Sequence, residues 1–225
     1  MYLFKSTIIV IMLIFGCSTG GGSMEFTSAK TAARTEKDLN KAELWGVKAL
    51  HVKSDSTNAL VPYFLAVEVY RKQNPPQWEK MAEMFNEAIR RNSEQKLETP
   101  KYLIDPEKIT KENYKESIAE TIQEGVDAYR EQEWINVYNK SLDYLDKDNI
   151  EAAIKHLEIA KMVDINNEKN YVFLSQIYLN NKDFENALIE ANKGLKHSGD
   201  STDLYTIIGS IHNEQGDLKQ AAIMY

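Results

Sequence analysis

A single cysteine and four histidines are the residues of this chain that could supply a nucleophile, a general base or a soft metal ligand. The cysteine, Cys17, has no second cysteine with which to form an internal disulfide. The histidines are His51, His156, His197 and His212. They form no His-x-x-x-His pair, and no carboxylates stand at metal-ligand spacing, which argues against zinc and against Ser or Cys nucleophiles. We therefore predict no enzyme activity, no cofactor and no metal site.

The amino-terminal residues 1–16 have the pattern of an export signal. Lys5 precedes a short apolar run over residues 8–15, and small residues follow directly. This run is too short to span a bilayer, for which about 20 apolar residues are needed. The next feature is the stretch Ile-Phe-Gly-Cys at residues 14–17, which resembles the lipobox of bacterial lipoproteins.

The lipobox resemblance implies that Cys17 is acylated and becomes the new amino terminus. Each buried methylene of an acyl chain contributes about 0.8 kcal/mol, so several chains together anchor a protein firmly to a membrane. Ser18 follows, and in two-membrane bacteria an aspartate there would favour the inner membrane; we therefore expect the outer membrane, facing the periplasm. Residues 17–24 contain a run of glycines and are predicted to be a flexible linker. The competing interpretation, a phosphate-binding loop, lacks a preceding strand and the motif's lysine and hydroxyl.

Residues 134–225 repeat with a period of 34 residues. The period is marked by Ala153, Ala187 and Ala221, by Ile150, Phe184 and Leu218, and by Asn149, Asp183 and Asp217. Asn and Asp make good helix caps, because their side chains accept hydrogen bonds from the free N–H groups of a first turn. Apolar residues between these marks recur at helical spacing. We predict two antiparallel helices per unit, stacked on the next unit because neither pair can bury its apolar stripe alone.

The units that start at Trp134, Glu168 and Thr202 resemble the tetratricopeptide repeat (TPR) family. The residues at the family's signature positions are Val137, Ser141, Tyr144, Ala153, Leu157 and Ala160, then Tyr171, Leu174, Ser175, Tyr178, Ala187, Ala191 and Gly194, and finally Tyr205, Ile208, Gly209, His212, Ala221 and Tyr225. The resemblance implies an all-α fold, a right-handed α-solenoid of TPR helix-turn-helix repeats, acting as a binding scaffold. Because the last unit stops at Tyr225, we expect either a fragment of a longer protein or a partner covering the apolar faces of Ile208 and Ala221.

The resemblance also implies where a ligand would bind, since the first helices of TPR units line a concave groove. The groove residues carried over in this way are Tyr138, Leu142, Lys169, Val172, Gln176, Asp203, Thr206 and Ser210, together with Ile135, Leu145, Leu179 and Asn213. The groove would be apolar at one end and polar at the other, which suits an extended or helical peptide. The alternative is that Leu142 and Leu145 pack against a neighbouring helix. A carboxylate clamp is not expected, because only Lys169 and Asn139 would fit it.

Residues 25–92 carry the same frame in a degenerate form. Asp38 stands at a cap position, and the prolines of the Asn74-Pro75-Pro76 stretch predict a loop. A second helix is expected from Trp78 to Arg91. The preceding helix is predicted to present one face made of Leu60, Tyr63, Phe64 and Val67.

The segment between the two halves interrupts the repeat. Residues 93–110 contain Pro100 and Pro106 and are predicted to be a loop, either a peptide or domain contact or an inert insertion. Residues 111–133 are predicted to form a long helix that leads into the array; a break near Gly125 or Arg130 is the alternative. The apolar residues at helical spacing in this segment are Ile118, Ile122, Val126 and Tyr129.

The composition is that of an acidic globular protein. The net charge is −7 and 43% of the residues are hydrophobic, with no basic patch for nucleic acid. We expect a protein or peptide partner in the groove and a membrane reached through the lipid anchor. One rival is a glycan- or ligand-binding outer-membrane lipoprotein, which would need exposed aromatic platforms; another is a structural spacer. The candidate platforms, Trp78, Tyr102 and Trp134, are interpreted as packing residues.

Overall fold

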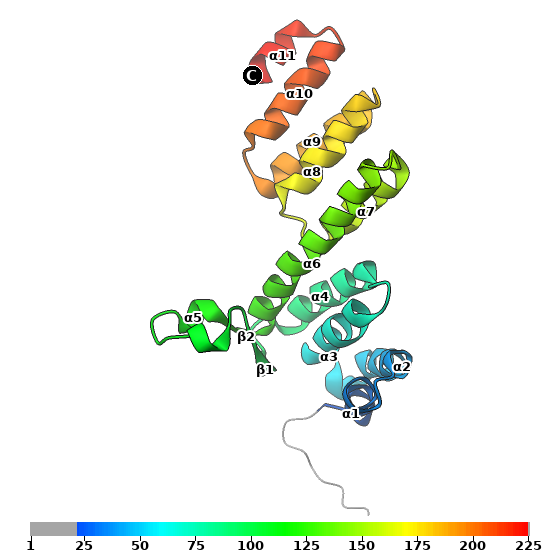
Figure 1. Ribbon diagram of the computed structural model, residues 1–225, viewed down its shortest axis with the longest axis vertical. Helices are drawn as coiled ribbons and strands as arrows, with labels where there is room; N and C mark the ends of the chain where they lie inside the picture. The colour runs from blue at the N-terminus through cyan, green and yellow to red at the C-terminus, as the bar shows by residue number, and fades with distance from the viewer. Residues whose placement is uncertain (1–21, 225) are drawn as a thin grey trace, which may run out of the picture.

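The structure is a computed structural model that describes residues 22–224, and over this range it is built of helices with one small two-stranded sheet. The helices are α1 (Met24–Thr31), α2 (Leu39–Leu50), α3 (Leu60–Phe64), α4 (Trp78–Asn92), α5 (Tyr114–Ser117), α6 (Ile122–Leu145), α7 (Ile150–Val163), α8 (Glu168–Asn180), α9 (Phe184–Ser198), α10 (Thr202–Glu214) and α11 (Leu218–Met224). The strands are β1 (Lys96–Tyr102) and β2 (Ile118–Thr121). Figure 1 shows an elongated molecule with α1 and α11 at opposite ends.

From α7 onward, the helices of the carboxy-terminal array begin at the predicted residues. α8 starts at Glu168 and α10 at Thr202, while the second helices α7, α9 and α11 follow the three predicted caps. The side chains of Asn149, Asp183 and Asp217 accept hydrogen bonds from the backbone N–H groups of Ala152, Asn186 and Gln220 at 3.1, 3.2 and 3.0 Å. α6 packs on α7, α8 on α9 and α10 on α11. The predicted all-α solenoid of TPR-like helix pairs is thus confirmed.

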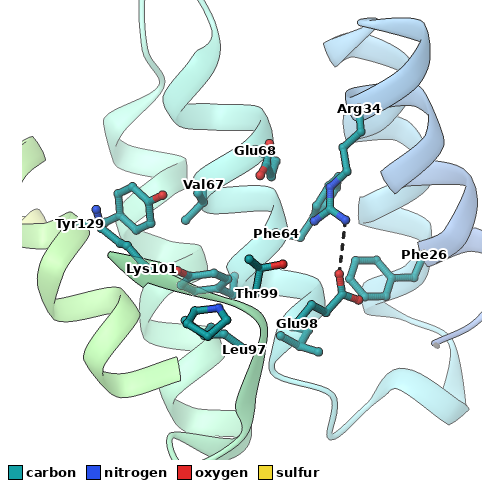
Figure 2. Close-up of a pocket in the computed structure, with 13 residues that line it drawn as sticks. Phe26, Arg34, Phe64, Val67, Glu68, Leu97, Glu98, Thr99, Lys101 and Tyr129 are labelled. Carbon is teal, nitrogen blue, oxygen red and sulfur yellow. Dashed lines mark hydrogen bonds and ion pairs between the residues drawn. The ribbon is translucent and has the colours of Figure 1, made fainter. Parts of the chain in front are cut away.

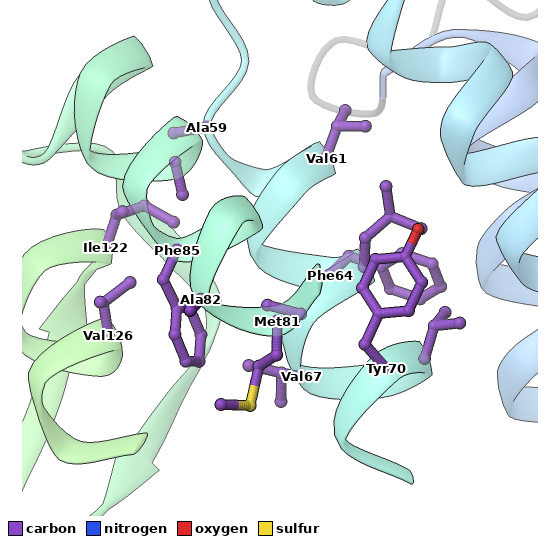
Figure 3. Packing of buried hydrophobic residues seen from close by; sticks show 14 of the residues in the cluster. Ala59, Val61, Phe64, Val67, Tyr70, Met81, Ala82, Phe85, Ile122 and Val126 are labelled. Carbon is purple, nitrogen blue, oxygen red and sulfur yellow. The ribbon is translucent and has the colours of Figure 1, made fainter. Parts of the chain in front are cut away.

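The amino-terminal half is also built of packed helices. Ser23 and Asp38 cap α1 and α2 through their side chains, and the π-helical turns Ala32–Glu36 and Leu65–Val69 extend α1 and α3. The predicted helix after the prolines is α4. Figure 3 shows its buried side chains between those of α3 and α6; the labelled residues are Ala59, Val61, Phe64, Val67, Tyr70, Met81, Ala82, Phe85, Ile122 and Val126. One hydrophobic core therefore joins α1–α4 to the first pair of the array.

The prediction for the middle segment was wrong in two respects. Within the expected loop 93–110, residues Lys96–Tyr102 form strand β1, which pairs antiparallel with β2. The long helix expected from residue 111 begins only at Ile122, because residues 118–121 are extended and pair Lys101 with Ala119 and Tyr102 with Ile118. The register is irregular between Lys96 and Lys101. The apolar residues at helical spacing therefore belong partly to a strand and partly to a helix. Periodicity alone does not distinguish the two.

Helix α6 is continuous, so the alternative of a break near Gly125 or Arg130 was also wrong. Thr121 and Glu124 form a complete capping box that defines its first turn. Gly125 has a packing role instead, since a Cβ at this position would lie 2.7 Å from Tyr63 Oη and 3.0 Å from Leu97 Cδ1.

Several predicted features lie outside the described residues: the signal at residues 1–16, the lipidation site Cys17, most of the linker 17–24, and Tyr225. At the far end of the array, Ile208 and Ala221 are buried, contrary to expectation, because they pack within the last helix pairs; Leu218 and Ile223 are exposed large apolar residues of α11. Over residues 22–224, no helix has both the length and the apolar character needed to cross a bilayer.

Candidate functional site

The first helices of the array carry the predicted groove, which we call the first-helix face. Its residues are Tyr138 and Leu142 on α6, Lys169, Val172 and Gln176 on α8, and Asp203, Thr206 and Ser210 on α10. Lys169, Gln176, Asp203 and Thr206 are exposed, whereas Tyr138, Leu142, Val172 and Ser210 are half-buried. The array therefore places side chains from three successive units at the surface, where a partner could reach them.

The aromatic end of the first-helix face is a packed cluster. The Tyr138 ring stacks on Trp134 with the ring centres 4.8 Å apart, and meets Phe173 edge to face at 5.3 Å. Trp134 is buried, its Nε1–H donates to Asn170 Oδ1 at 2.8 Å, and Lys169 Nζ lies 5.9 Å from its ring centre. Burial raises the pKa of Tyr138, so its phenol remains protonated. This end offers the edge of a rigid aromatic cluster.

Some residues of the predicted groove pack against hydrophobic core clusters, which was the alternative interpretation for Leu145. Leu145 packs against the core cluster of Leu157, Leu174 and Ile177, and Val172 packs against two further core clusters. These side chains therefore contribute to the stability of the array as well as to its surface.

The polar end presents Gln176, Asp203 and Thr206 at the surface. Gln176 Nε2 donates to Asn180 Oδ1 at 2.8 Å, and Ser210 Oγ donates to the carbonyl oxygen of Thr206 at 2.9 Å. The first bond joins residues of α8 and the second joins residues of α10. Asp203, about two turns before Ser210 on α10, is exposed.

A second candidate site was missed by sequence reasoning. The tyrosine cavity, as we call it, has a volume of about 470 Å³ and lies among α1, α3, β1 and α6. Its walls are Phe26, Arg34, Leu60, Tyr63, Phe64, Val67, Glu68, the Leu97–Lys101 part of β1, and Tyr129. Figure 2 shows Tyr129 and Lys101 at one end and Phe26 and Arg34 at the other. The sequence signal for this cavity was the predicted helix face made of Leu60, Tyr63, Phe64 and Val67. The sequence did not predict that β1 would cover this face.

Charges sit at both ends of the tyrosine cavity. At the Phe26 end, Glu98 is shared by Lys30 at 2.6 Å and Arg34 at 3.4 Å. At the Tyr129 end, Lys101 Nζ lies 4.2 Å from the centre of the Tyr129 ring, and the Arg71 guanidinium lies 4.9 Å from it. Burial, together with the charge of Arg71, holds the pKa of Lys101 below its ordinary value.

Two tyrosines, Tyr63 and Tyr129, line the same cavity. Burial raises the pKa of both Tyr63 and Tyr129, so both phenols are neutral at physiological pH. Neither hydroxyl is hydrogen-bonded to another residue in the part of the chain that the structure describes. A neutral phenol of this kind can donate to, or accept from, a molecule that reaches its oxygen.

His156, His197 and Trp78 have packing roles. His156 contacts the rings of Tyr144 and Trp78 at 4.8 and 6.3 Å, and His197 stacks on Tyr171 at 6.0 Å. Trp78 is half-buried and its Nε1–H donates to Glu133 Oε2 at 3.1 Å. Among residues 22–224, no three His, Cys, Asp or Glu side chains are grouped as metal ligands. Tyr102, however, is 53% exposed, contrary to its interpretation as a packing residue, because it lies at the end of a two-stranded sheet.

Comparison with known proteins gives limited resemblance. No family model and no curated protein matches the chain. Among solved structures, a crystal structure of MamA protein aligns at 15% identity with a TM-score of 0.37, over 89% of this chain and 85% of MamA. YrrB, described as a TPR protein with an unusual peptide-binding site, aligns at 15% identity and a TM-score of 0.35, over 89% of this chain and 80% of YrrB. PilF of Pseudomonas aeruginosa aligns at 15% identity and a TM-score of 0.34, over 89% and 71% of the two chains. The TPR-like solenoid is accordingly assigned from the helix pairs themselves.

Proposed function

We propose that this protein is a scaffold of the bacterial cell envelope that holds a segment of a partner protein along its first-helix face. The observation that carries the proposal is the in-phase array itself, in which α6, α8 and α10 bring exposed polar side chains and one aromatic edge onto the first helices. An extended or helical segment can contact several such units in succession, and each unit adds affinity and specificity. Of the three candidate sugar platforms, Trp78 and Trp134 donate hydrogen bonds to internal partners and Tyr102 alone is exposed, which favours a protein partner over a glycan.

The location is the second part of this proposal. Acylation of Cys17 would hold the array at the periplasmic face of the outer membrane, with the glycine-rich linker between them. The support is the lipobox-like stretch and the absence of an aspartate after the cysteine. Metabolic labelling with palmitate, followed by membrane fractionation, should label the natural chain and not Cys17→Ser. Labelling of both chains, or of neither, would refute the anchor.

The binding role is tested by affinity capture from detergent-solubilised envelopes. The test variant is Gln176→Arg with Thr206→Arg, which adds bulk and charge at two exposed positions of the first-helix face. The matched control is Asn192→Arg with Ala222→Arg, which makes the same charge change at exposed positions of second helices. We expect a defined protein to be captured by the natural chain and the control and lost from the test variant. Capture by all three would place the binding surface elsewhere, and capture by none would favour a structural spacer.

A further inference from the structure

The tyrosine cavity has the size and the lining of a small-molecule site. Its volume of about 470 Å³ lies within the roughly 300–1,000 Å³ typical of such pockets. Four aromatic rings line it: Phe26 and Phe64 meet edge to face at 5.6 Å, and Tyr63 and Tyr129 lie 6.3 Å apart. Segments distant in the sequence converge here, so the shape is fixed by the tertiary fold.

The charges around the cavity are not balanced. At the Tyr129 end, Arg71 has a carboxylate partner in Glu133, at 3.5 Å, but Arg71 Nε is buried and has no hydrogen-bond partner. Lys101, over the same ring, has no carboxylate within ion-pair distance in the described part of the chain. Of these two cations, therefore, Arg71 has a carboxylate partner and Lys101 has none among the described residues.

The acidic residues of the cavity do not remove this excess. Glu98 is held between Lys30 and Arg34 at the opposite end, and Glu68 is paired with Lys72 at 2.5 Å. An anion placed beside Lys101 would meet an uncompensated positive charge in a partly desolvated site, where charge-assisted hydrogen bonds are strong.

We propose that the tyrosine cavity binds a small carboxylic acid with an aromatic body, the rings packing among Phe26, Phe64 and Tyr129 and the carboxylate meeting Lys101. The neutral Tyr129 phenol, at the same end of the cavity as Lys101, supplies a further donor to such an anion. This site lies in the amino-terminal half and is independent of the first-helix face.

The test compares two compounds of the same shape, 2-naphthylacetate and the neutral alcohol 2-(2-naphthyl)ethanol. Each is titrated calorimetrically into the full chain held in nanodiscs, with empty nanodiscs as the blank. Because the acid would make one charge-assisted hydrogen bond that the alcohol lacks, we expect the acid to bind at least about tenfold more tightly than the alcohol. Equal affinities, or binding of neither compound at millimolar concentration, would overturn the proposal.

Three variants locate the site. Lys101→Met keeps the aliphatic part of the side chain but removes its charge. It should lower the affinity for the acid about tenfold and leave the affinity for the alcohol unchanged. Lys108→Met, at an exposed position away from the cavity lining, makes the same charge change and should alter neither affinity. Thr99→Trp, from an exposed position of β1, should fill the cavity and abolish binding of both compounds. Undiminished binding to Thr99→Trp, or an equal effect of the two lysine variants, would contradict the assigned site.

Discussion

Gly194 tests the close packing of the array most directly. It lies in α9 against α8 and α10, and its neighbours Tyr171 and Leu204 are buried. A Cβ at this position would lie 2.6 Å from Leu204 Cδ1, 2.7 Å from Tyr171 Cβ and 3.1 Å from Tyr171 Cγ. Leu204 Cδ1 ends a side chain, but Tyr171 Cβ is attached to the backbone of α8, so the helices themselves must separate.

Two effects of opposite sign compete in Gly194→Ala. Alanine favours a helix interior over glycine by about 1 kcal/mol. Overpacking costs about 1–3 kcal/mol, and contacts below van der Waals distance with two buried residues indicate the upper part of that range. We therefore expect a net loss of about 2 kcal/mol in the free energy of unfolding, and a larger loss for Gly194→Val.

The assay is urea unfolding of the full chain followed by circular dichroism. With a slope of about 2 kcal/mol/M, the expected loss lowers the unfolding midpoint by about 1 M. Asn192→Ala, at an exposed position of the same helix, improves helix propensity without touching Tyr171 and should leave the midpoint equal or higher. If Gly194→Ala also raised the midpoint, helix propensity would outweigh packing and the close approach of α8 to α9 would be wrong.

Three further predictions concern single contacts. Asp183→Ala removes the cap of α9 and should cost about 1 kcal/mol in urea unfolding, whereas Asp183→Asn should cost little. Arg91 donates to the carbonyl oxygens of Asp55 at 2.8 Å and Leu50 at 3.1 Å. Arg91→Lys should therefore lower the free energy of unfolding by about 2 kcal/mol in the same assay. A decrease no larger than that of an exposed lysine substitution would count against this role. Hydrogen bonds from Arg90, and then from Arg91, lower the pKa of Glu87 to about 2, so its stabilising effect is complete above its ordinary pKa of 4.5 and is lost as pH falls from there towards 2. Glu87→Gln should flatten the fall in stability over that range, and an unchanged profile would refute the assignment.

The repeat was predictable because its signals are local. A cap such as Asp183 acts on the N–H groups of its own first turn, and small residues such as Ala187 recur where helices cross. The exposed or half-buried state of the first-helix face followed from the same frame. Which of its side chains are also needed for packing, such as Val172, depended on neighbouring helices and could not be read from the period.

The middle segment shows the limit of such signals. Ile118 and Tyr129 fit one helical spacing, yet β1 pairs with residues 118–121 and makes them extended. Pairing between strands is a non-local choice, because the partner strand lies some twenty residues away and its register is irregular.

The sequence by itself determined the helix-pair repeat, its caps and the faces that pack, since these depend on periodicity and on interactions within a few residues. Only the tertiary structure decided the tyrosine cavity. Its rings come from α1, α3 and α6, and it is closed by a strand whose place no local pattern specifies. The uncompensated charge of Lys101 likewise exists only because β1 places that side chain beside Arg71 and over Tyr129.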